Sequence, residues 1–148
     1  MSLIELIVVT GILGVMVALA MPRREPGMFA LRTAQSTLLA DLRMARGSAI
    51  AAAVHFRVEI LDDGSYGVLR MVEGGGGWVQ DGDPEILRTL PPSVSFSGGV
   101  GEGYEFNTRG LLVEPTSAAT VTLADSTTGQ SRTVDVWPSG QVAAGEAL

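Results

Sequence analysis

The 148-residue sequence contains no cysteine and only one histidine, His55. The missing cysteine excludes a disulfide, a thiolate metal site and a cysteine nucleophile. All ten basic residues are arginines, and we interpret the absence of lysine as codon bias. Sixteen acidic residues set the net charge at −6, which argues against non-specific binding to nucleic acid or to anionic lipid.

Sequence signals for catalysis are equally scarce. His55 has no serine and aspartate at the spacing of a catalytic triad, and we expect it to be a structural or exposed residue. The four glycines Gly74–Gly77 are followed by neither a lysine nor a helical pattern, so they predict a loop and not a phosphate cradle. We therefore expect a protein that is not an enzyme and needs no cofactor.

One long apolar run opens the chain, from Leu3 to Met21, and its only charged residue is Glu5. At about 1.5 Å per residue such a helix spans roughly 28 Å, close to the ~30 Å core of a bilayer. A secretory signal is one alternative, since Ala18–Ala20 imitates a cleavage site, although no basic residue precedes the run. A plain single-pass anchor is another, and neither explains the carboxylate.

The stretch Ser2-Leu3-Ile4-Glu5-Leu6, followed by an apolar run that ends at Pro22, resembles the N-terminus of type IV pilins and type II secretion pseudopilins. The resemblance implies that a prepilin peptidase exposes Met1, whose amine is then N-methylated. Met1 stands where the family usually has phenylalanine. The resemblance also implies that Glu5 pairs with the Met1 amine of a neighbouring subunit, which would set the register of the filament.

The same resemblance implies a life cycle. The chain would be a single-pass protein of the inner membrane with its head in the periplasm. An inner-membrane assembly platform would then add it to other pilin or pseudopilin subunits, in a periplasmic pseudopilus or an extracellular pilus. Residues Gly11, Gly14 and Pro22 weaken the N-terminal helix, and we expect a kink there or local melting in the filament.

The pattern divides the chain into three segments: residues 1–27 as the membrane and filament-core helix, 28–54 as an amphipathic helix, and 55–148 as a β-rich head. Apolar residues of the second segment recur at helical spacing, and this stripe consists of Leu31, Leu38, Leu42, Ala45, Ala49 and Ala52. Four charged residues lie off the stripe, namely Arg32, Asp41, Arg43 and Arg46. The predicted fold class is α+β, with one long helix packed on an antiparallel sheet or sandwich.

Beyond His55 the sequence predicts short strands separated by turns. Phe56–Ile60 alternates apolar and polar residues, and Asp63-Gly64 marks a hairpin turn before Tyr66–Val72. The later expected strands are Glu85–Leu90, Ser93–Ser97, Gly103–Phe106, Leu111–Val113, Ala119–Ala124 and Thr133–Trp137.

Three stretches resemble the GspH/FimT branch of the superfamily. Leu38–Arg46 is similar to its "L-x-x-D-L-R-x-A-R" helix, Tyr104–Gly110 to its strand entering an "F-x-x-x-G" turn, and Val134–Val142 to its closing strand and "S-G-R-V" turn. The chain departs from the last motif at Gln141, where the branch commonly has arginine.

Two binding alternatives stay open. Asp81, Asp83 and Glu85 form a weak calcium candidate in a stretch that also has ordinary turn chemistry. The resemblance also raises a DNA-binding minor pilin in DNA uptake, which would need arginines such as Arg57, Arg70, Arg88 and Arg109 to converge; nucleic-acid binding is the less favoured expectation. A membrane-tethered binding module of the envelope that never polymerises is a further alternative.

Overall fold

The computed structural model describes residues 26–145 and the isolated residue Gly11, which is helical and exposed. The described chain begins with one long helix, α2 (Pro26–Ala52), and continues as strands. The strands are β1 (His55–Asp62), β2 (Ser65–Gly74), β3 (Gly77–Gln80), β4 (Ile86–Thr89), β5 (Val94–Phe96), β6 (Gly103–Phe106), β7 (Leu112–Glu114), β8 (Ala119–Asp125), β9 (Ser131–Val136) and β10 (Val142–Ala144).

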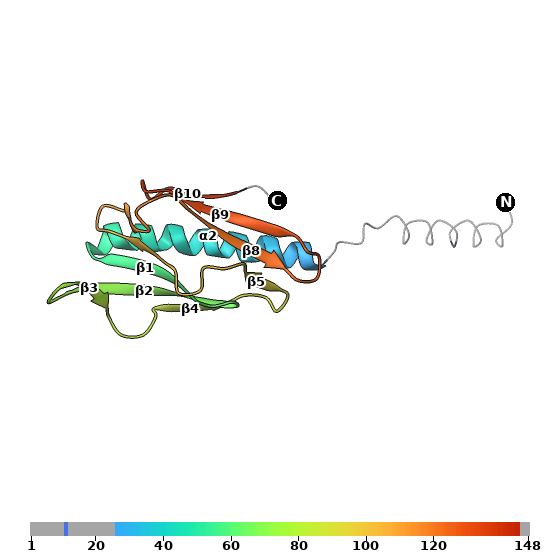
Figure 1. Cartoon of the computed structure of the whole chain (residues 1–148), viewed down its shortest axis with the longest axis horizontal. Coiled ribbons are helices and arrows are strands. Elements are labelled where there is room, and N and C mark those ends of the chain that lie inside the picture. Colours follow the sequence, from blue (N-terminus) through green and yellow to red (C-terminus); the bar gives the residue numbers. More distant parts are fainter. Residues whose placement is uncertain (1–10, 12–25, 146–148) are drawn as a thin grey trace.

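The strands form two antiparallel sheets. The larger sheet has the order β3-β2-β1-β6-β7, with β4 also paired to β2, and the smaller has the order β10-β9-β8-β5. Figure 1 shows α2 lying lengthwise between them, with β1 and β2 on one side and β8, β9 and β10 on the other. The predicted α+β class, one helix packed on antiparallel sheets, is confirmed.

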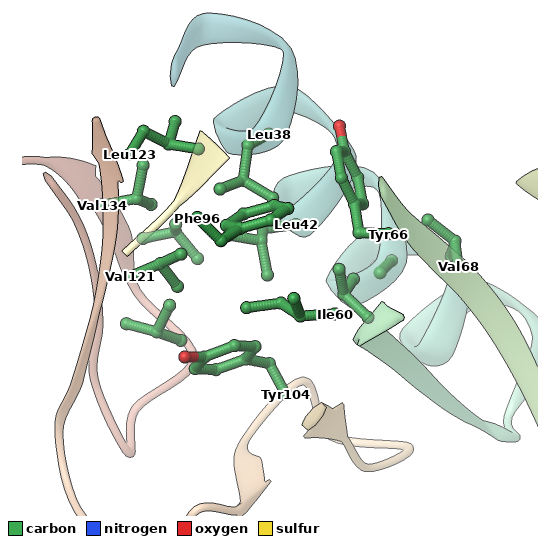
Figure 2. Close-up of a cluster of buried hydrophobic side chains, with 14 of the residues drawn as sticks. Leu38, Leu42, Ile60, Tyr66, Val68, Phe96, Tyr104, Val121, Leu123 and Val134 are labelled. Carbon is green, nitrogen blue, oxygen red and sulfur yellow. The ribbon is translucent and has the colours of Figure 1, made fainter. Parts of the chain in front are cut away.

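The core fills the angle between the helix and the two sheets. Figure 2 shows Leu38 and Leu42 of α2 pointing toward Ile60 and Phe96, with Leu123 and its neighbours closing the other side. The stripe residues from Leu31 to Ala49 are all buried as predicted. Ala52 is exposed, so its inclusion in the stripe was wrong: α2 ends there, and the next residue, Ala53, turns the chain away with φ 52°.

The strand predictions mostly match the structure, and two strands were missed. The predicted Asp63-Gly64 turn joins β1 to β2. The glycine run was expected to be a loop, but only Gly75 and Gly76 form the turn, and Gly77 already begins β3. Strand β10 follows the turn at Ser139–Gly140 and pairs with β9.

Helix α2 is the only helix within residues 26–145, and it ends at Ala52. Among residues 26–145 no helix is apolar enough over a sufficient length to cross a membrane.

Candidate assembly surface

The three stretches that resemble the GspH/FimT branch meet at the C-terminal half of α2. Arg46 of the helix donates from Nε to the carbonyl of Gly110 at 3.0 Å and from Nη2 to that of Ser139 at 3.4 Å. Gly110 and Gly140 have φ of 72° and 74°, a region that favours glycine. A Cβ on Gly140 would collide with the Gly110 carbonyl, so the two turns can only approach this closely without side chains.

A second arginine of α2 connects the helix to strand β10. Arg43 donates from Nη2 to the carbonyl of Val142 in β10 at 3.2 Å. Gln141, which replaces the branch's usual arginine, has an exposed side chain, while its carbonyl accepts from the amide of Trp137 at 2.9 Å. Because backbone hydrogen bonds close this turn, having glutamine instead of arginine at position 141 does not disturb the contact between the turn and α2.

Asp41 lies off the apolar stripe and is nevertheless buried, with 4% of its surface exposed. Its Oδ2 accepts from the Tyr66 hydroxyl at 2.8 Å and from Arg88 Nε at 2.9 Å. Burial, reinforced by the hydrogen bond to Asp41, raises the pKa of Tyr66, and the same carboxylate raises the pKa of Arg88. This network ties the middle of α2 to β2 and β4. The sequence did not reveal it, because its three members are separated by long stretches of chain.

The side of α2 that faces away from the sheets carries few charges. Its uncharged exposed residues at helical spacing, called the exposed stripe, are Phe29, Thr33, Ser36, Ala40, Met44, Gly47 and Ala51, with exposed Arg43 next to Met44. Phe29 is 72% exposed, and a side chain at Gly47 would meet nothing within 4 Å. Arg32 and Arg43 flank the stripe. An uncharged strip of small residues permits close approach of another helix.

Most of the residues to which the N-terminal resemblance gives a role lie outside the part of the chain that the structure describes. Met1, Glu5, Gly14 and Pro22 lie outside the described residues. Gly11 alone is described, and it is helical and exposed. The pairing of Glu5, the processing of Met1 and the weakening of the helix therefore stay predictions.

The structure does not assemble the weak calcium candidate. Asp81, Asp83 and Glu85 are all exposed, and no group of three acidic or histidine side chains suited to a metal ion occurs within the described ranges. The arginines proposed for DNA do not share one surface either. Arg88 turns toward the helix to reach Asp41, whereas Arg57 lies on the opposite face of the same sheet and bonds Glu114 at 3.4 Å.

A pocket of about 430 Å³ opens beside β6 and β7. Its polar lining comes from the side chains Arg57, Glu102, Tyr104, Glu114 and Ser117. Burial raises the pKa of Tyr104 to about 12, and its hydroxyl donates to Glu102 at 3.4 Å. The pocket thus mixes two acids, one base and two hydroxyl groups.

Comparison with solved structures gives the fold a name. The type IV minor pilin FimU of Pseudomonas aeruginosa superposes with a TM-score of 0.63 and 18% identity, over 80% of this chain and 92% of that one. The chain has the type IV pilin and pseudopilin fold. The minor pseudopilin EpsH from the type 2 secretion system of Vibrio cholerae shares it, with a TM-score of 0.59 and 15% identity over 78% of this chain and 95% of EpsH.

A sequence relative extends the likeness over nearly the whole chain. The pilin-like protein PilA1 of Thermus thermophilus is 28% identical over 152 residues, which cover 95% of this chain and 94% of PilA1. No family model matches the chain. The relative and the shared fold together support the type IV pilin and pseudopilin superfamily, as the N-terminal motif implied.

Proposed function

We propose that this chain is a non-enzymatic structural subunit of a type IV pilus or a type II secretion pseudopilus, assembled from the inner membrane through its N-terminal helix. The observation that carries the proposal is the two-sided character of α2. One side is sealed into the head by Leu31, Leu38 and Leu42, and the opposite side is an exposed, uncharged stripe. Small uncharged side chains on this side leave room for a neighbouring helix to pack closely against α2.

The N-terminal sequence supplies the rest of the proposal. The apolar run from Leu3 to Met21 would anchor the chain first and pack among neighbouring helices later. Glu5 would then bind the Met1 amine of the next subunit, because an unpaired charge in an apolar bundle is costly and a partner removes most of that cost. The proposed partners are other pilin subunits, a prepilin peptidase and the assembly platform.

The test replaces Glu5 by leucine or by glutamine in cells that make the filament. Both variants should stay in the membrane fraction, since they make the segment more apolar or leave it uncharged, and both should be lost from sheared filaments. Ile7→Leu is the matched control, because it keeps volume and hydrophobicity in the same segment. Wild-type incorporation of both Glu5 variants would refute the pairing.

A further inference from the structure

The sole histidine of the chain is buried on the outer face of the larger sheet and makes two close contacts. Its Nδ1 lies 2.6 Å from Oε1 of Glu105 in β6, and both residues are less than a tenth exposed. Its ring stacks on Trp78 of β3, with ring centroids 3.7 Å apart and planes inclined by 12°. The three side chains come from β1, β3 and β6, and β2 runs between His55 and Trp78.

Strand β3 is attached to the sheet by its ladder with β2 and by this stack. It is an edge strand that pairs only with β2, through the short register from Met71↔Gln80 to Gly74↔Gly77. Its other residues are largely exposed, and Val79 is 50% exposed. Trp78 is the β3 side chain that reaches across the sheet, so the stack on His55 holds the strand down.

We propose that His55, Glu105 and Trp78 form a pH-responsive latch that holds β3 firmly while His55 is charged and loosens when it becomes neutral. A protonated ring gives the bond to Glu105 the added strength of a charge-assisted hydrogen bond and attracts the face of the indole. A neutral ring with its proton on Nδ1 keeps the bond but loses both attractions. The result is a looser strand and not a detached one.

Charged groups on three neighbouring strands share the sheet face of His55 or lie beside it. Glu105 faces it from β6, Glu73 shares its face on β2, and Glu114 is opposite Glu105 on β7. Within residues 26–145 the nearby cation on that face is Arg57, the cross-strand partner of Glu105, which lies 3.3 Å from Glu59 and 3.4 Å from Glu114.

Loosening β3 would uncover the backbone edge of β2 from Met71 to Gly74. An open edge is a template for pairing with another chain. The latch therefore couples external pH to the availability of one sheet edge, independently of the proposed role of the N-terminal helix.

The test measures acrylamide quenching of Trp78 fluorescence between about pH 5 and 8, the range in which a histidine ordinarily changes charge. The full chain is kept in non-ionic detergent and carries Trp137→Phe, which leaves Trp78 as the single indole. Quenching should be low at acidic pH and should rise with one titration step as pH increases.

Two further variants, each in the Trp137→Phe background, separate the latch from a general loss of structure. His55→Gln keeps a hydrogen-bonding side chain without a titrating ring, and its quenching should not change over this range. Glu105→Gln removes the carboxylate charge and should shrink the step. Melting curves by circular dichroism should show that both fold. Quenching that is flat in the parent, or a step of equal size in either variant, would overturn the proposal.

Discussion

A few polar residues fix the position of helix α2 in the head. Asp41 binds the Tyr66 hydroxyl and Arg88, and Arg46 binds the carbonyls of two separate turns. Removing one member of such a set leaves the others without a partner, which costs more than the net strength of one hydrogen bond. These residues specify the position of α2 between the sheets, where apolar packing alone would tolerate sliding.

Alkaline pH should weaken the head through its two tyrosines. Burial raises the pKa of Tyr66, and it raises that of Tyr104 to about 12, whereas both would ionise near pH 10 in the unfolded chain. The unfolded state then loses protons that the folded state keeps. Stability from these groups is complete below about pH 10 and falls as pH rises through the folded pKa values.

The tyrosines can be tested without interference from other side chains that titrate in the same pH range, because the chain has no lysine and no cysteine. The free energy of unfolding, measured by urea titration from pH 9 to 11, should fall in the wild type. It should fall less in Tyr66→Phe and stay nearly level in Tyr66→Phe/Tyr104→Phe. An equal fall in the double variant would show that other groups cause the loss.

At the scale of elements, α2 has a glycine where the head does not require one. Gly47 lies on the exposed stripe, and a Cβ there would touch nothing. Because alanine is the better helix former, Gly47→Ala should raise the free energy of unfolding by about 1 kcal/mol. If a neighbouring subunit packs on the stripe, the same change should reduce incorporation into filaments.

Ala40→Gly is the matched control, since it lies on the same stripe and should lower stability by a similar amount without adding volume. Incorporation that falls in Gly47→Ala and not in Ala40→Gly indicates close packing on the stripe. Incorporation that follows stability in both variants would contradict it. The measurement is quantitative blotting of sheared filaments.

Local sequence patterns correctly predicted those elements whose defining interactions are between residues close together in the sequence. The alternation in Phe56–Ile60 and the Asp63-Gly64 turn identified the first hairpin, and the spacing of Leu31, Leu38 and Leu42 identified the buried side of α2. Strand β3 was not predicted, because its first residue belongs to a glycine run that indicates a loop. Strand β10 has only three residues, which gives periodicity almost nothing to act on.

Long-range pairings could not be foretold in the same way. Asp41 and Arg88 are joined by the pairing of β4 with β2, and His55 and Glu105 by that of β1 with β6. The resemblance to the GspH/FimT branch did single out Arg46, Gly110 and Gly140, which the structure brings together. It did not show that an arginine of the helix binds the turns of both other motifs.

At the scale of the whole molecule, α2 is buried in the head on one side and exposed on the other. The two sheets flank α2 (Figure 1), its apolar residues are buried, and the residues of the uncharged stripe are exposed. In the proposed function, such a subunit would be anchored and folded before assembly and would then exchange lipid for neighbouring helices. This assembly would require that the N-terminus be processed before the chain enters a filament.

The most direct measurement is the intact mass of the chain recovered from sheared filaments, with fragmentation of its N-terminus. We expect a chain that starts at Met1 with one methyl group on its amine, enriched in filaments relative to membranes. A chain found only in membranes, with an unmodified or formylated Met1 or with cleavage near Ala20, would contradict it, and the pairing of Glu5 with Met1 would fall with it.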